Sequence, residues 1–163
     1  MTVNEASDRA KPASRSGFGL SLKGRALRLL AGREHSRTEL ERKLGRHEEK
    51  PGQLAQVLDE LQAKDFINEA RVVESVIHRR AARLGAVRIR HELLNKGLNA
   101  DLVAAAIDGL NRSELERARE VWRKKFGEPA SDAAGRARQM RFLAARGFGG
   151  GVIHRVVTQA DDA

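Results

Sequence analysis

Residues 93–99 have the sequence LLNKGLN, and a related heptapeptide, LAARGFG, occupies residues 143–149. In each, an apolar helical run ends at a glycine, Gly97 or Gly147, and these two glycines are fifty positions apart. Glycine most easily adopts the left-handed conformation that closes a helix. The stretch from Leu40 to Gly45 fits the same frame, fifty-two positions before Gly97. This recurrence indicates tandem structural units.

Each unit that one of these glycines marks contains three short amphipathic segments. Apolar residues recur at three- and four-residue spacing from Leu22 onward, and no alternating segment is long enough to predict a strand. A helix of about twelve residues is marginal alone and becomes stable by packing. We expect helices over residues 22–34, 36–46, 51–64, 68–84, 86–97, 99–110, 113–127, 132–146 and 149–160.

The sequence therefore predicts an all-α fold of three tandem three-helix repeats that form an elongated, modular molecule. We place the repeats at residues 22–66, 67–111 and 112–163. Residues 1–21 lack helical periodicity and are expected to form a flexible leader. The alternative is a single globular helical bundle in which the glycine spacing is a coincidence.

Several residues mark the expected helix ends. Serine followed three residues later by glutamate predicts a capping box, and asparagine predicts an N-cap. These starts are Ser36 with Glu39, Ser113 with Glu116, Asn68 and Asn99, with Pro51 as a first-turn proline. The expected C-terminal glycines are Gly45, Gly85, Gly97 and Gly147.

The composition limits both the class of protein and its partners. Of 163 residues, 31 are Lys or Arg and 22 are Asp or Glu, which gives a formal charge of +9 and favours a polyanionic partner. A charged face that only keeps the protein soluble is the alternative. There is no Cys, which excludes disulfides and thiolate metal sites. Without a run of about 18 apolar residues, we expect no membrane partner and a cytoplasmic location.

Residue patterns that carry catalysis are missing from the sequence. The five His residues do not form an HxxxH or HExxH pair. The glycines at 149–151 lack the GxxxxGK[ST] context of a phosphate loop and are expected to form the turn between the last two helices. We therefore expect no catalytic residue, no metal site, no cofactor and no enzymatic activity.

Positive charge is concentrated in the second and third units. Residues 71–96 carry seven Lys and Arg against Glu74 and Glu92. Arg71, Arg79 and Arg83 fall on a four-residue spacing that stacks guanidinium groups along one helical face, where they suit acidic groups or successive phosphates. A solvated face is the alternative. The candidate binding residues are Arg71, Arg79, Arg83, Arg88, Arg90 and Lys96 at one edge, and Arg136, Arg138, Arg141 and Arg146 at another.

A collinear series of segments resembles the RecX family of regulatory proteins. These segments are 26–33 (ALRLLAGR), 36–44 (SRTELERKL), 58–61 (LDEL), 66–71 (FINEAR), 92–97 (ELLNKG) and 141–148 (RFLAARGF). The closing Arg146-Gly147-Phe148 element is the most specific of them. The resemblance extends from Leu22 to the C-terminus.

The resemblance implies a monomeric, non-enzymatic negative regulator of the RecA recombinase. Such a protein binds in the groove of the RecA filament on single-stranded DNA and inhibits ATP hydrolysis, strand exchange and co-protease activity. This implies a role in homologous recombination, DNA repair and the SOS response. The candidate arginines would then contact the filament, and direct contact with DNA stays open.

Two other functions compete with this interpretation. A DNA-binding regulator of the helix-turn-helix type also has short three-helix units with basic helices, but its basic residues gather on one recognition helix. A general nucleic-acid chaperone would bind DNA, RNA and heparin equally. Binding to one preferred duplex sequence without RecA would favour the first of these.

Overall fold

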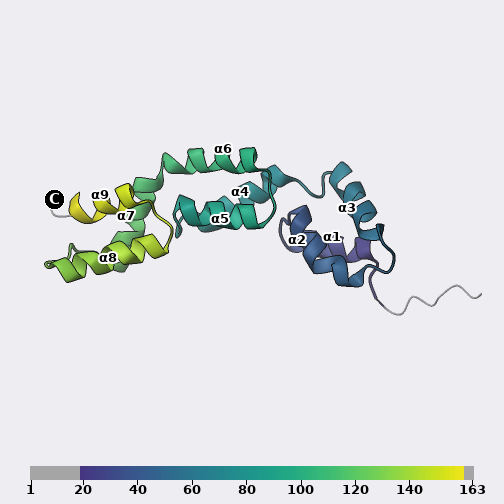
Figure 1. The fold of residues 1–163 in the computed structure, drawn as a ribbon, viewed down its shortest axis with the longest axis horizontal. Helices are drawn as coiled ribbons and strands as arrows, with labels where there is room; N and C mark the ends of the chain where they lie inside the picture. Colours follow the sequence, from purple (N-terminus) through teal and green to yellow (C-terminus); the bar gives the residue numbers. More distant parts are fainter. Residues whose placement is uncertain (1–18, 160–163) are drawn as a thin grey trace, which may run out of the picture.

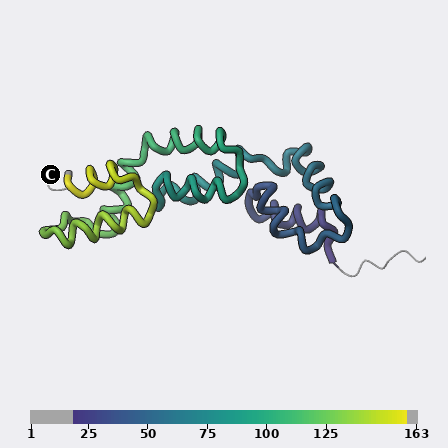
Figure 2. Tube along the Cα trace, viewed as in Figure 1, coloured from purple at the N-terminus to yellow at the C-terminus, as the bar shows by residue number. Residues whose placement is uncertain are grey.

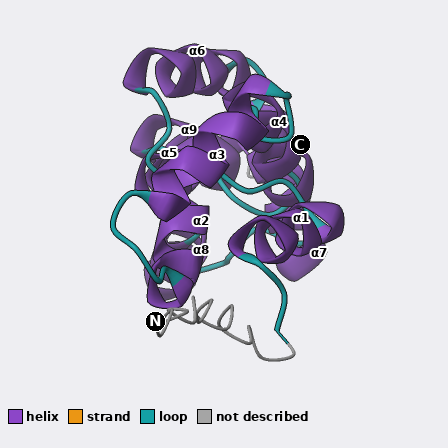
Figure 3. Cartoon of the chain, turned by 90° about the vertical axis from the view of Figure 1, so that its right-hand side faces the viewer, coloured by secondary structure: helices purple, strands orange, loops and turns teal. Residues whose placement is uncertain are grey.

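The computed structural model describes residues 19–159 and is entirely helical over that range. It contains nine α-helices and one short 3-10 helix, with no strand among the described residues. Figure 1 shows the helices following one another along the long axis of the molecule, and Figure 3, which looks along that axis, shows helices joined only by loops.

The first repeat consists of α1 (Leu22–Gly32), α2 (Arg37–Leu44), the 3-10 helix η1 (Gly45–His47) and α3 (Gln53–Ala63). Ser21 caps α1 by accepting a hydrogen bond from the Gly24 amide. The apolar faces of the three α-helices meet in a core that includes the fully buried Leu40, Leu58 and Leu61.

The second repeat consists of α4 (Glu69–Arg80), α5 (Ala86–Asn95) and α6 (Ala100–Asn111). Asn68 and Asn99 cap α4 and α6 as expected, because each side-chain oxygen accepts a hydrogen bond from a first-turn amide. Val76, Ile89 and Leu93 are fully buried in the core of this repeat.

The third repeat consists of α7 (Glu114–Lys125), α8 (Ala133–Ala145) and α9 (Gly150–Gln159). Its core contains Trp122, Leu143 and Val157. The indole Nε1 of Trp122 donates to Oε1 of Gln139 at 2.9 Å, which satisfies the polar end of a buried aromatic side chain.

Each repeat has its own hydrophobic core, and the three cores share no buried residue. The trace in Figure 2 runs from the first repeat at one end of the molecule to the third at the other. The prediction of an all-α fold with three tandem three-helix repeats in an elongated molecule is confirmed, and a single bundle is not formed. Most of the expected leader, residues 1–18, lies outside the described residues, and the boundaries set between the repeats stay predictions.

Some of the expected helix ends are wrong. Ser113 does not form a capping box: its hydroxyl donates to the Leu110 carbonyl and accepts from Arg117 Nε, so it extends the turn after α6. Pro51 precedes α3, whose N-cap is Gly52. The structure also gives other roles to two of the expected turn and stop glycines: Gly85 is the N-cap of α5, and Gly150 begins α9. Gly45 is the C-cap of α2 as expected, but it is right-handed and η1 begins there.

Candidate interaction surface at the joints between repeats

The second and third repeats are joined through the ends of their middle helices, α5 and α8. The Gly85 amide, before α5, donates to the carbonyl of Arg146 at 2.8 Å, and the Val87 amide donates to that of Gly147 at 3.2 Å. Gly147 has φ +87, and a Cβ there would overlap the backbone of Arg88. The last turn of α8 therefore docks closely on the first turn of α5.

The first and second repeats are joined in the same manner, through α2 and α5. Ser36 Oγ donates to the Lys96 carbonyl at 2.6 Å, and Arg42 Nη1 donates to the Asn95 carbonyl at 2.8 Å. Gly97 has φ +70 and packs against Thr38. The repeated heptapeptide that marks the fold in the sequence thus forms both joints, with its left-handed glycine against the neighbouring helix.

An arginine-lined cavity of about 460 Å³ opens where the second and third repeats meet. Leu84, Phe142 and Ala145 give it an apolar lining, and four arginines complete it: Arg80, Arg83, Arg88 and Arg146. The Arg146 guanidinium lies 4.7 Å from the centre of the Phe142 ring, which holds it at the wall by a cation–π contact. Arg80 is paired with Glu92 at 3.1 Å.

This cavity brings together three of the candidate binding residues, which were expected at two different edges of the binding surface. Arg83 and Arg88 come from the second repeat and Arg146 from the third. Arg88 Nη1 also donates to the Ala145 carbonyl at 2.7 Å, which ties one wall to the other. A guanidinium can bind a carboxylate or phosphate with two parallel hydrogen bonds, so the cavity suits an anionic group with an apolar neighbour.

Two other candidate residues have acidic partners within the chain. Arg71 is paired with Glu34 at 3.0 Å and with Asp65 at 2.8 Å, and these hydrogen bonds raise the pKa of its guanidinium. Lys96 is paired with Glu39 in a largely buried contact. Arg71 and Lys96 therefore lie in the joint between the first two repeats, where their charges are neutralised.

The remaining candidate residues lie on the helix surfaces. Arg79 is exposed on α4 and donates to the Ser75 carbonyl, while Arg90 is exposed on α5. On α8, Arg138 and Arg141 are exposed and Arg136 is half-buried. The expected arginine row on one helix is interrupted, because α4 ends at Arg80 and Arg83 lies in the following turn.

Arg117 of α7 has a structural role that the sequence does not indicate. Its Nη1 donates to the carbonyls of Ala81 and Leu84 at 3.0 and 2.7 Å, and its Nη2 donates to that of Leu110 at 3.3 Å. Burial lowers the pKa of this guanidinium. The side chain holds the end of α4 to α7, and spacing along α7 gave no sign of these distant carbonyls.

A second basic cavity, in the first repeat, was also missed, because its residues come from separate helices. It is lined by side chains of α1, α2 and η1. Among residues 19–159, no helix is both long and apolar enough to span a membrane, and no three His, Asp or Glu side chains gather as metal ligands would.

Three family models match the chain in tandem order. The first three-helix domain of RecX matches residues 23–61, the second matches 68–107, and the third matches 113–157. Each match covers helices of one of the three repeats in the structure.

Similar proteins and solved structures agree with these models. The regulatory protein RecX of Leptothrix cholodnii is 57% identical over 142 residues, which cover 87% of this chain and 90% of the relative. That of Herminiimonas arsenicoxydans is 49% identical over 141 residues, with 86% and 91% covered.

The crystal structure of RecX from Lactobacillus salivarius matches with a TM-score of 0.70 at 18% identity, covering 87% of this chain and 96% of that one. Another crystal structure of a regulatory protein RecX matches with a TM-score of 0.69 at 16% identity, covering 85% and 71%. At this identity the likeness shows the fold alone, whereas the family models and the relatives confirm the resemblance found in the sequence. The chain therefore belongs to the RecX family of regulatory proteins.

Proposed function

We propose that this protein is a negative regulator of the RecA recombinase. It binds the RecA filament on single-stranded DNA and inhibits ATP hydrolysis, strand exchange and co-protease activity. It acts in the cytoplasm as a monomer, by binding and without catalysis or a cofactor. Membership of a family of regulatory proteins supports the regulatory part of this proposal.

The observation that carries the proposal is the arginine-lined cavity between the second and third repeats. Arg83, Arg88 and Arg146 surround an apolar floor there, on a chain whose repeats are held in line by specific joints. A filament presents the same groups on successive subunits. An elongated protein with several weak contacts binds such a lattice far better than it binds one subunit.

The test is inhibition of single-stranded-DNA-dependent ATP hydrolysis by the cognate RecA, at protein concentrations too low to coat the DNA. Strong inhibition is expected. Charge reversal of the exposed pair Arg79 and Arg83 to Glu is expected to weaken inhibition without unfolding the protein. The matched control reverses Arg112 and Lys124, which are exposed and line neither basic cavity.

One outcome would contradict the assigned contact residues, and another would contradict the proposed function. Unchanged inhibition by the Arg79 and Arg83 variant would show that these arginines do not contact the filament. Absent inhibition, with salt-sensitive binding to one preferred duplex sequence in a RecA-free control, would instead identify a DNA-binding regulator of the helix-turn-helix type.

A further inference from the structure

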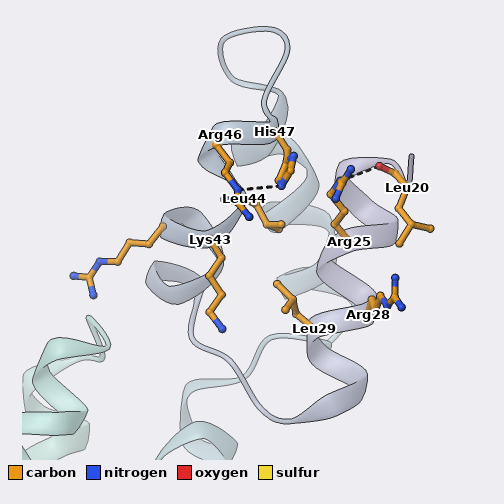
Figure 4. Close-up of a pocket in the computed structure, with 9 residues that line it drawn as sticks. Leu20, Arg25, Arg28, Leu29, Lys43, Leu44, Arg46 and His47 are labelled. Carbon is orange, nitrogen blue, oxygen red and sulfur yellow. Dashed lines mark hydrogen bonds between the residues drawn. The ribbon is translucent and has the colours of Figure 1, made fainter. Parts of the chain in front are cut away.

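The outer end of the first repeat holds a basic cavity of about 470 Å³ that lies apart from the arginine-lined cavity described above. Figure 4 shows Arg25 of α1 at one end, near Arg46 and His47 of η1, with Leu29 and Leu44 between Lys43 and Arg28. The complete lining is Leu20, Arg25, Arg28, Leu29, Arg42, Lys43, Leu44, Arg46 and His47.

The charge of this cavity is unbalanced. Five Lys and Arg residues line it, and no Asp or Glu does. Several other cations in or beside the first repeat have acidic partners: Lys23 and Lys64 both contact Glu60, at 2.7 and 2.9 Å, and Arg33 contacts Glu39 at 3.1 Å. Among residues 19–159, no salt bridge to Asp or Glu is formed by any of the five cations at the cavity. The cations at this cavity therefore have no acidic partner in the described residues, and the cavity carries a net positive charge.

The rim of the cavity also carries a histidine, His47, that lies close to two of these cations. Arg46 Nε donates to His47 Nε2 at 3.3 Å, so this imidazole nitrogen acts as an acceptor and the ring is neutral. Partial burial, followed by the charges of Arg25 and Arg46, lowers the pKa of His47. An anion in the cavity would relieve the repulsion among these groups.

The position of the cavity within the repeat pattern explains why it is open. In the second and third repeats, the middle helix ends at a left-handed glycine that docks on the preceding repeat. The first repeat has no preceding repeat within the described chain. Its Gly45 is instead right-handed, with φ −52, and the helix continues as η1 through Arg46 and His47. The C-terminal end of α2, which corresponds to the docking ends of α5 and α8, therefore docks on no preceding repeat, and its cations line the basic cavity.

We propose that this cavity binds the phosphodiester backbone of single-stranded nucleic acid. Arg28, Lys43 and Arg46 are exposed and contact successive phosphates, which attract such cations with release of bound counterions. Leu29 and Leu44 lie between these cations and provide an apolar floor for sugars and unstacked bases. A duplex hides its base faces and gains nothing from that floor. This site is independent of the proposed contact with RecA.

The experiment measures binding of the full-length protein to a fluorescent oligothymidine by anisotropy, over a series of KCl concentrations and without RecA. The test variant combines Arg28→Gln with Arg46→Gln. Losing two phosphate contacts is expected to reduce the slope of log K against log salt by about 1.4, and to weaken binding roughly 10- to 100-fold at low salt. The control variant, Arg112→Gln with Lys124→Gln, removes the same charge elsewhere and is expected to keep the original slope.

A second measurement locates the contact. Lys43 is expected to be protected from acetylation by the bound oligothymidine, whereas Lys124 is not. Equal losses in both variants, or no protection of Lys43, would overturn the proposal, and tighter binding to a duplex of the same length would overturn its single-strand preference. If the test variant keeps its affinity for oligothymidine but no longer inhibits RecA in the separate ATP hydrolysis assay, the cations contact protein and not DNA, which would also overturn the proposal. Because the binding assay contains no RecA, failure here leaves the filament proposal standing.

Discussion

The hydroxyl of Ser36 donates to the carbonyl of Lys96, sixty residues along the chain, at 2.6 Å. The same serine accepts the Glu39 amide and caps α2. One side chain therefore fixes the start of the middle helix of the first repeat and the end of the middle helix of the second. Since the two cores share no buried residue, the relative orientation of these repeats depends on such polar contacts.

Substituting Gly147 with Ala should destabilise the joint between the second and third repeats. The position has φ +87, and the added Cβ would overlap backbone atoms of Arg88, which have little freedom to move. The left-handed conformation alone costs a non-glycine residue about 1–2 kcal/mol. We expect urea denaturation to show a loss of at least about 2 kcal/mol. Gly109→Ala is the control: it lies within α6 with open space around it and should gain about 0.5–1 kcal/mol.

Neutralising Glu39 should weaken the joint between the first two repeats. Its carboxylate accepts hydrogen bonds from the Lys96 ammonium, from Arg33 Nη1 at 3.1 Å and from the Ser36 amide at 3.3 Å. Glu39→Gln leaves the nearly buried Lys96 without its counter-charge, at a cost of about 2 kcal/mol in urea denaturation. Replacing Lys96 with Met in the same chain should restore part of the loss.

The control for Glu39 is Glu41→Gln on the same helix. Glu41 pairs with Arg37 at 3.1 Å, but its side chain is half exposed, and such pairs contribute about 0.2–1 kcal/mol. A loss as large in this variant as in Glu39→Gln would show that burial of the contact between Glu39 and Lys96 is unimportant.

Protonation of His35 should destabilise the protein in mild acid. Burial lowers the pKa of this histidine below 6.5; its Nδ1 hydrogen-bonds the Arg33 carbonyl at 3.0 Å, and Lys43 Nζ lies 3.4 Å from Nε2. Because the folded pKa is below the unfolded value, this stability is complete above pH 6.5 and is lost as the pH falls through the folded pKa. Urea midpoints between pH 7.5 and 5 should fall, and His35→Gln should reduce that dependence. The exposed His154→Gln should leave it unchanged.

The fold could be predicted from the sequence because residues close together in the chain determine where each helix of a repeat begins and ends. Apolar spacing predicts each helix, and Gly97 and Gly147 end their helices as expected. The expectation that Gly85 ends a helix is wrong, because a glycine between two helices suits either the end of one or the start of the next. Its role as N-cap of α5 follows from the contact with Arg146, which local sequence does not reveal.

The candidate site could be predicted only in part, because sequence shows where cations lie along a helix and not what faces them. Arg83, Arg88 and Arg146 meet at one cavity, from positions up to 63 residues apart. Arg71 instead pairs with Glu34, which belongs to another repeat. Spacing along α4 cannot distinguish an arginine that is available to another molecule from one that forms a salt bridge within the chain.

Replacing Arg117 should separate α7 from the second repeat. Three backbone carbonyls accept hydrogen bonds from its guanidinium, and Lys cannot reproduce that planar set of donors. Arg117→Lys should therefore lose about 1–3 kcal/mol in urea denaturation, since the carbonyls of Ala81 and Leu84 are left without a donor, whereas that of Leu110 keeps its hydrogen bonds from Ser113. Arg123→Lys, on the exposed face of the same helix beside Glu120, should stay within about 0.5 kcal/mol of the parent protein. Equal stability of the two variants would mean that water satisfies the carbonyls equally well and that Arg117 does not hold the repeats together.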